Sequence, residues 1–279
     1  MNIVNIIEEI EKVDGEIYER LSPRRSAMKD FYNMGKKVAL AAMPMALGSM
    51  FTKAYGQSTP SDVTATLNFA LTLEYLEYHF YNHAVANASA IALSGAALTA
   101  ITTIRDHEKA HVALLAGALG SAAIPVKAYT DFDYTAKGTF PNVFSDYGTF
   151  LAVAQAFEDT GVRAYKGQAT VLKGNAVLTT ALQIHSVEAR HAAHIRYMRA
   201  ASGVSIKPWI SLGPGGSSND SGVPAADPVY AGENNTSQAN INIVGINGNT
   251  GITAAAAAEC FDEPLAKADV LTIAGLFIK

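Results

Sequence analysis

Cysteine and charged residues are both scarce in this chain of 279 residues. Cys260 is the only cysteine, which excludes an internal disulfide framework and a cysteine-based zinc site. Charged residues make up 16% of the chain, and 21 Lys and Arg against 25 Asp and Glu give a net charge of −4. Because there is no basic excess, we expect no nucleic-acid partner.

Long apolar runs are missing as well. No run reaches the roughly 20 residues that a membrane-spanning helix needs, so we expect no transmembrane helix. Apolar residues nevertheless account for 49% of the chain, which is enough for a sizeable buried core. Together these features predict a globular protein with one main core.

Residues 1–59 allow two interpretations. Apolar residues at helical spacing over the first 21 positions predict an amphipathic helix, and Arg24-Arg25 and a short apolar run at 38–51 follow it. If Arg24-Arg25 acts as a twin-arginine export signal, the protein belongs in the periplasm or cell envelope. If the segment is a retained helical arm, we expect a cytoplasmic protein that pairs through the arm with a second subunit or forms a homo-oligomer.

Residues 60–201 predict four helices. Two short loops and one long irregular segment, at 121–145, separate them. Short loops join antiparallel helices, whereas a long connection lets two helices run parallel. The fold class is therefore all-α, a four-helix bundle with one long crossover connection. The predicted helices span about 60–87, 96–120, 146–172 and 176–201.

Residues 202–279 form a long tail of different composition. The tail is rich in Gly, Asn, Ser and Pro and reads as mostly irregular. Alternation predicts one short strand at 241–244, and a helix resumes near Ala254. Because the end of the tail is apolar, we expect it to pack on the bundle through 269–278. We expect Cys260 to be buried or half-buried.

Two Glu-x-x-His pairs lie in the second and fourth predicted helices. Glu108 precedes His111, and Glu188 precedes His191, by three residues. Residues three apart share one side of a helix, so each pair directs two metal-binding side chains toward one place. Both pairs lie near the middle of their helices.

A Glu and a Tyr seven residues apart occupy each of the other two helices. Glu74 precedes Tyr81, and Glu158 precedes Tyr165; two helical turns place each pair on one face. The order Glu, Tyr, Glu-x-x-His thus occurs twice, with Glu-to-Glu separations of 34 and 30 residues, as a duplicated helical hairpin would give. Glu77, one turn from Glu74, is an alternative to Glu74 as the functional glutamate of this helix.

Four glutamates in apolar helices need neutralising charge. Unpaired buried carboxylates are very unfavourable, and two divalent ions would balance all four. Carboxylates with imidazoles suit iron or manganese, so the predicted cofactor is two iron or two manganese ions. Tyr81 and Tyr165 would donate hydrogen bonds that orient the carboxylates. The predicted metal ligands are Glu74, Glu108, His111, Glu158, Glu188 and His191.

The pattern resembles the ferritin-like di-iron carboxylate proteins, which take one Glu from each of two helices and Glu-x-x-His from each of the others. A closer resemblance is to the bacterial ferritin-like domain proteins related to plant desiccation-related proteins. Three segments carry that likeness: LNFALTLEYLE at 67–77, VYAGENNTSQ at 229–238 and FDEPL at 261–265. The resemblance implies a ferritin-like bundle in which Glu108 and Glu188 bridge the two ions.

The resemblance leaves several functions open. An oxidase or ferroxidase acting on O2 is the first hypothesis, with no catalytic residue beyond the metal ligands. A manganese-catalase-like enzyme would use peroxide on the same ligands. A structural or stress-related protein would use the metal only for stability. Other histidines are predicted at the surface or as supporting groups, with a separate surface metal site at the first two as an alternative: His79, His83, His107, His185 and His194.

Overall fold

The structure, a computed structural model of the chain, describes residues 61–279. The predictions for residues 1–59, including the Arg24-Arg25 signal and the partner-binding arm, lie outside the described residues. None of the helices described combines the length and hydropathy that crossing a membrane requires.

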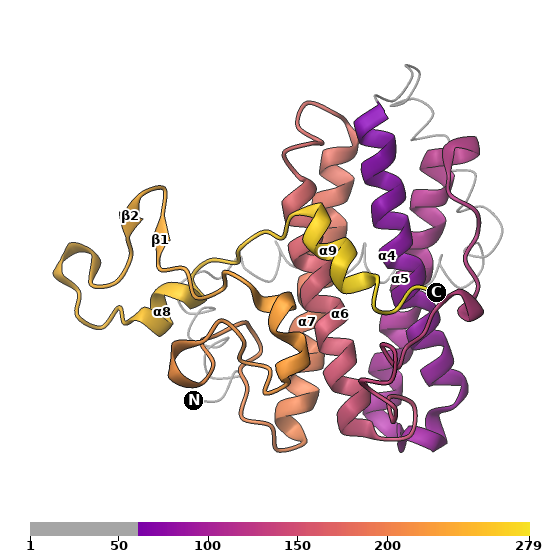
Figure 1. Cartoon of the computed structure of the whole chain (residues 1–279), viewed down its shortest axis with the longest axis horizontal. Helices are drawn as coiled ribbons and strands as arrows, with labels where there is room; N and C mark the ends of the chain where they lie inside the picture. Colours follow the sequence, from indigo (N-terminus) through magenta and orange to yellow (C-terminus); the bar gives the residue numbers. More distant parts are fainter. Residues whose placement is uncertain (1–60) are drawn as a thin grey trace, which may run out of the picture. The chain divides into compact units, whose positions relative to one another are not determined.

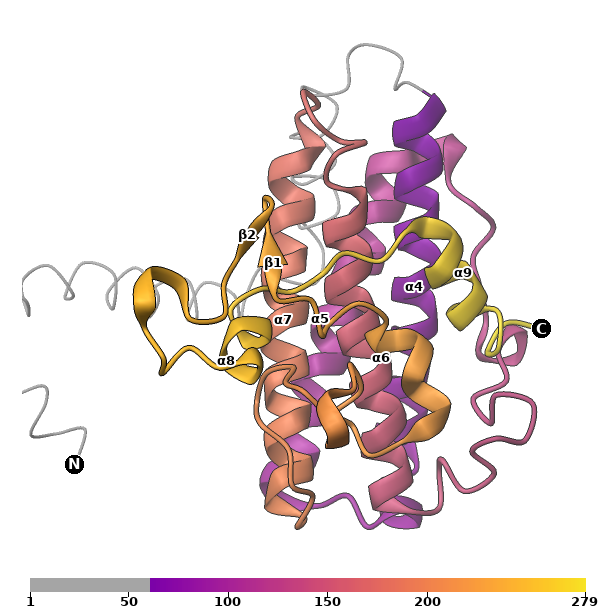
Figure 2. The ribbon, with the colours of Figure 1, turned by 60° about the vertical axis from the view of Figure 1, so that its left-hand side comes forward.

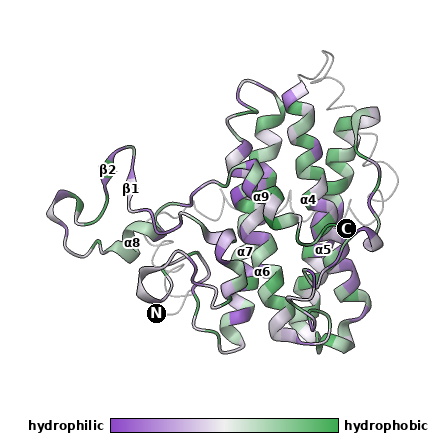
Figure 3. Cartoon of the chain, in the orientation of Figure 1, coloured by the Kyte–Doolittle hydropathy of each residue, from purple (hydrophilic) through white to green (hydrophobic). Residues whose placement is uncertain are grey.

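Four long helices form a bundle of two hairpins (Figure 1). Helix α4 packs against α5 and α6 packs against α7, while contacts of α4 with α6 and of α5 with α7 join the hairpins. Hydrophobic residues run along all four helices (Figure 3). The all-α bundle predicted from the sequence is therefore confirmed. The helices are α4 (Ser61–Ala86), α5 (Gly95–Leu119), α6 (Tyr147–Gln168) and α7 (Val177–Ala201).

The connections follow the predicted order of short, long and short. The segments 87–94 and 169–176 close the two hairpins, and 120–146 crosses from α5 to α6. Asp146 caps the N-terminus of α6: its side chain accepts a hydrogen bond of 2.7 Å from the backbone N–H of Thr149. Short 3-10 helices lie at Ala88–Ile91, Gly120–Ala122, Tyr129–Asp131, Pro214–Gly216, Pro224–Tyr230 and Ile246–Gly248.

Helix α6 ends at Gln168, four residues before the predicted end. The β-branched residues Thr170 and Val171 disfavour another helical turn. Gly174 has a φ of +82°, which suits the turn into α7. The loop is therefore longer than the three-residue turn that the sequence predicts.

Aromatic rings hold the crossover against the bundle. Phe80 of α4 lies at the centre, with ring centroids 5.4 Å from both Tyr134 and Phe144 and 5.0 Å from Phe157 of α6. The Tyr134 hydroxyl donates a 2.8 Å hydrogen bond to the backbone oxygen of Leu76. This cluster fixes α4 relative to α6 near one end of the bundle.

The tail contains a small hairpin and two short helices. Strand β1 (Ser237–Gln238) pairs antiparallel with β2 (Ile241–Asn242). Helix α8 spans Ala254–Glu259, at the predicted position, and α9 spans Lys267–Ala274. The sequence predicts only one strand, because the hairpin turn pairs Ala239 with Asn240, both at positive φ, and alanine rarely signals such a turn. Cys260 follows α8 and is exposed, contrary to prediction.

The end of the tail lies on the bundle. Helix α9 contacts α6, and Figure 2 shows it lying in front of α4. Phe277 meets Phe157 edge to face at a centroid distance of 4.7 Å, and Ile278 forms a β-bridge with Phe132 of the crossover. The apolar end thus packs against both the crossover and α6.

Buried arginines tie the tail to α6 and α7, a feature that the sequence analysis did not identify. The Arg163 Nε of α6 lies 2.8 Å from the Glu233 Oε1 of the tail. Arg196 of α7 pairs with Asp159 at 2.7 Å and with Asp220 at 2.8 Å. Arg163 also donates to the backbone oxygens of Val229, Ala231 and Glu263, so the buried arginines join the tail to the bundle.

Candidate metal centre

The six predicted ligands meet inside the bundle. Each of the four helices contributes one glutamate whose side chain is completely buried, and α5 and α7 each add a histidine that is less than 9% exposed. The amphipathic spacing of each helix turns these side chains inward together. The residues are Glu74 on α4, Glu108 and His111 on α5, Glu158 on α6, and Glu188 and His191 on α7.

The first cluster consists of His111 and three glutamates. The Nδ1 of His111 lies 3.1 Å from Glu74 Oε2, 3.1 Å from Glu108 Oε2 and 3.1 Å from Glu188 Oε1. The ligand atoms of these residues all lie within 4.8 Å of one another. A single cation could therefore contact all four side chains.

The second cluster consists of His191 and three glutamates. The Nδ1 of His191 lies 2.9 Å from Glu108 Oε1, 3.3 Å from Glu158 Oε2 and 3.6 Å from Glu188 Oε2. Glu108 and Glu188 belong to both groups and offer one oxygen to each. The arrangement therefore consists of two adjacent four-residue clusters that share two carboxylates.

The two predicted tyrosines pair with carboxylates across the bundle. Tyr81 of α4 donates a 2.5 Å hydrogen bond to Glu158 Oε1 of α6, and Tyr165 of α6 donates to Glu74 Oε1 of α4. Burial raises the pKa of both phenols well above the usual value, so both remain donors. The reciprocal pairing is what a duplicated hairpin would produce.

The charge of the site fits divalent cations. Within residues 61–279, Glu108 Oε1, Glu158 Oε2 and both Glu188 oxygens are buried without a well-formed hydrogen bond. The buried arginines are engaged elsewhere; the third of them, Arg199, donates to Gln155 at 2.6 Å. Unpaired buried carboxylate oxygens are very unfavourable, and two divalent ions would satisfy them.

Comparison with known families agrees with this geometry. The family model described as "Ferritin-like domain" matches residues 62–201, half of the chain. The chain belongs to this ferritin-like family. The matched range begins in α4 and ends with α7, so it contains all six clustered residues. No curated protein and no solved structure matches the chain significantly.

The ionisable groups of the ferritin-like centre are strongly perturbed. Burial alone would lower the pKa of His191, but the surrounding carboxylates, Glu158 foremost, raise it to about 12. The pKa of His111 is raised for the same reason. Burial raises the pKa of Glu158 to about 7, whereas contacts with both imidazoles outweigh burial and lower the pKa of Glu188 to about 2. Without metal, the surrounding carboxylates therefore favour the protonated form of both imidazoles.

Glu77 is a fifth buried glutamate beside the ferritin-like centre. It is 4% exposed, yet the two clusters contain Glu74 and not Glu77. Burial, followed by repulsion from Glu188, raises its pKa. It lines a cavity of about 10 Å³ together with Thr160 and with Ile273 of α9. That volume holds about one water molecule.

The other histidines lie outside the two clusters. The His107 Nδ1 lies 2.9 Å from the His191 Nε2, so one of the predicted supporting histidines contacts the centre. Among residues 61–279 the alternative surface site gains no partner carboxylate: the His79 Nε2 bonds the Lys127 carbonyl at 2.8 Å, and His83 stacks on an aromatic ring. His194 is exposed and His185 is half-buried.

Proposed function

We propose that the chain binds two iron or two manganese ions and uses them on O2 or peroxide. The ligands are the six clustered residues Glu74, Glu108, His111, Glu158, Glu188 and His191. The observation that carries the proposal is the pair of buried four-residue clusters sharing Glu108 and Glu188, four of whose carboxylate oxygens lack a well-formed hydrogen bond among the described residues. Glutamate and imidazole donors suit both metals.

Each protein group has a distinct role in this proposal. Glu108 and Glu188 belong to both clusters and would be held in common by the two ions, while His111 and His191 would each add a ligand on one side. Tyr81 and Tyr165 hold one oxygen of a carboxylate, which leaves the other oxygen directed at the clusters. When bound, the two ions supply reversible one-electron steps toward O2 or peroxide.

The surroundings of the centre favour a small substrate. The carboxylates are fully buried, and the cavity beside Glu77 has room for about one water molecule. So little space beside the centre favours a very small reactant such as O2 or hydrogen peroxide over an organic molecule. Ile273 and Ala274 of α9 form part of the wall of this cavity, so α9 limits its size.

A structural or stress-related role is the second candidate. Its specific support is the complete burial of four carboxylates, which makes the metal-free bundle carry unfavourable charge that a metal would relieve. A metal could therefore serve stability alone. The link to desiccation-related proteins belongs to this candidate and rests on the sequence likeness.

The first experiment is metal content per chain, with protein purified without chelators and then exposed to Fe(II) or Mn(II). We expect about two ions per chain in the wild type and a loss of two-ion loading in Glu108→Ala. Asp106→Asn is the matched control, because it removes an exposed carboxylate from the same helix. Full loading of Glu108→Ala would refute the ligand assignment.

The activity is then separated by substrate. Rapid O2 uptake with Fe(II) supports an oxidase or ferroxidase, and O2 release from peroxide by the manganese form supports catalase-like chemistry. A loaded protein that does neither, and only melts at a lower temperature without metal, supports the structural role.

A further inference from the structure

The two halves of the centre differ at one position outside the clusters. The duplicated Glu-x-x-His pairs are each preceded by one residue, which is His107 on α5 and Val187 on α7. His107 has two hydrogen-bonding nitrogens, whereas valine has none. The difference matters only if His107 reaches the centre.

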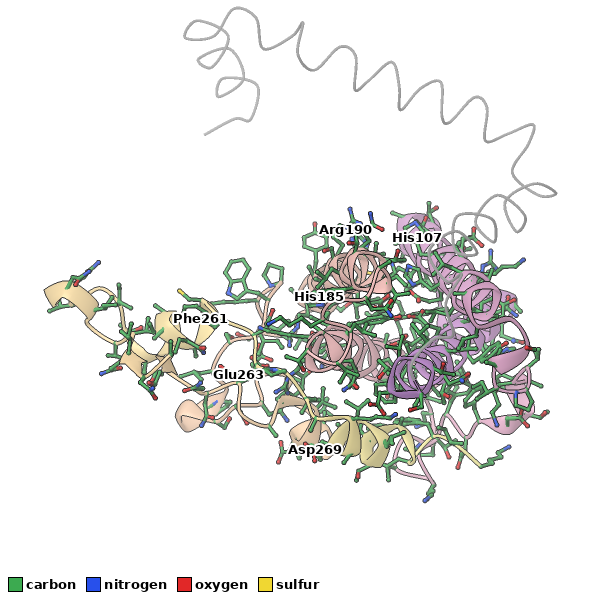
Figure 4. All side chains as sticks on the ribbon, turned by 90° about the horizontal axis from the view of Figure 1, so that it is seen from above. His107, His185, Arg190, Phe261, Glu263 and Asp269 are labelled. Atoms are coloured by element: carbon green, nitrogen blue, oxygen red, sulfur yellow. The ribbon has the colours of Figure 1, made fainter. Side chains whose placement is uncertain are left out.

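His107 reaches the centre through His191. Its Nδ1 lies 2.9 Å from the Nε2 of His191, and the two rings stack with centroids 5.2 Å apart and planes 14° apart. Figure 4 shows His107 and Arg190 at the same outer edge of the bundle. His107 is itself exposed, so it contacts the buried imidazole from the solvent side.

This contact fixes the tautomer of His191. The Nδ1 of His191 faces the carboxylates, and metal binding there requires its lone pair. A neutral imidazole that uses Nδ1 as a ligand carries its proton on Nε2. The Nε2–H then donates to the Nδ1 of His107, and a ligand imidazole held in this way is oriented and more basic.

His111 lacks the equivalent support. The duplication places Val187 where His107 stands in the other half, and among residues 61–279 the Nε2 of His111 has no hydrogen-bond partner. Its Nδ1 nevertheless faces the carboxylates as that of His191 does. The two halves therefore offer similar ligands, but among the described residues only the His191 imidazole has a hydrogen-bond partner at its Nε2.

We propose that His107 is a positioning residue that makes the two metal positions unequal. The position at His191 binds its ion more tightly and fills first, and the position at His111 fills second. The inference rests on the proposed dinuclear site and adds to it an order of filling.

The test is a Co(II) titration of the full chain, followed by visible absorption and by competition with a chelator. Co(II) is chosen because its d–d bands report the ligands of each ion. We expect two separate binding steps in the wild type. In His107→Val, which copies Val187, the tighter step weakens by about 10- to 100-fold and approaches the other, and its absorption bands shift.

Two further variants make the result specific. His107→Asn places its side-chain oxygen near the position of Nδ1 and should restore the separation of the steps, which a purely structural role would not require. Arg190→Ala, a neighbouring exposed change, should leave both steps as in the wild type. Equal affinities and spectra in the wild type and His107→Val would overturn the inference while leaving the dinuclear site intact. A wild type that binds no Co(II), Fe(II) or Mn(II) would overturn both.

Discussion

At the scale of single residues, each buried tyrosine restrains a carboxylate of the opposite hairpin. Tyr165 donates to Glu74 and Tyr81 donates to Glu158, and all four side chains are buried. A carboxylate with one oxygen held by a phenol has less freedom to turn away from the centre. The tyrosines should therefore contribute to metal affinity without contacting the metal themselves.

We expect Tyr165→Phe to weaken metal binding by about 10- to 100-fold, because Glu74 loses the donor that orients it. Chelator competition with Mn(II) measures the change. Tyr197→Phe, at a side chain that is 63% exposed, is the control and should bind as the wild type does. An unchanged affinity in Tyr165→Phe would show that the helices alone position Glu74.

Neutralising Glu77 and neutralising Glu74 should have different effects on metal loading. Glu77 lies outside both clusters, so Glu77→Gln should retain about two ions per chain, whereas Glu74→Gln should lose loading at the His111 position. Metal content after dialysis measures both. The reverse result, with loading lost in Glu77→Gln and kept in Glu74→Gln, would restore the alternative that Glu77 is the ligand.

The spacing of residues predicts which way a side chain points better than it predicts how deeply the side chain is buried. Glu-x-x-His and the seven-residue Glu-to-Tyr step place six candidate ligands and two tyrosines on inward faces, and the structure brings all eight together. Spacing could not predict that Glu77 is also buried, because its cover includes α9, more than 180 residues away in the sequence. The contact of His107 with His191 likewise depends on how α5 packs against α7.

At the scale of elements, helix existence follows from periodicity, and the ends follow from tertiary contacts. The four bundle helices and α8 lie where their patterns predict them, but α6 stops early at the turn into α7. The β1–β2 hairpin lacks a strong turn sequence, with Ala239 at positive φ. The contacts of the buried arginines with the tail could not be predicted, because Asp220 and Glu233 lie outside the long helices, in segments without any helical or strand periodicity.

The ion pair between Arg163 and Glu233 holds the tail on α6. Arg163→Met leaves the Glu233 carboxylate buried and unpaired, so the variant should lose about 3–5 kcal/mol of stability. Chemical denaturation measures the free energy of unfolding. The double variant Arg163→Met with Glu233→Leu removes both charges and should recover part of that loss. A double variant less stable than the single one would contradict the assignment.

At the scale of the whole molecule, the duplicated hairpins explain the shape of the site. Each hairpin supplies Glu, Tyr and Glu-x-x-His, and the long crossover lets the two hairpins face each other. Packing them together encloses four carboxylates, which isolated hairpins would leave in water. The fold therefore concentrates charge that metal binding relieves. The stability of the metal-free protein should fall as the pH rises, whereas the stabilisation by bound metal should increase.

In the metal-free protein, stability should fall as the pH rises from about 5 to 9. Glu158 has a folded pKa of about 7 against an ordinary value of 4.5, so the stability from its protonated form is lost as the pH rises through 7. His191, raised from 6.5 to about 12, contributes fully below 6.5 and progressively less above it. Glu188, lowered to about 2, contributes equally at every pH above about 4.5.

Metal reverses this trend. The ligands must lose their protons to bind a metal ion, so the affinity for Mn(II) increases as the pH rises. At a fixed Mn(II) concentration, the metal therefore stabilises the folded state more at high pH than at low pH. The melting temperatures of chelated and Mn(II)-loaded protein should therefore diverge between pH 5.5 and 8.5. Asp106→Asn should show the same divergence, and Glu108→Ala should lose it. Parallel melting curves for the wild type would mean that the buried carboxylates do not exchange protons for metal.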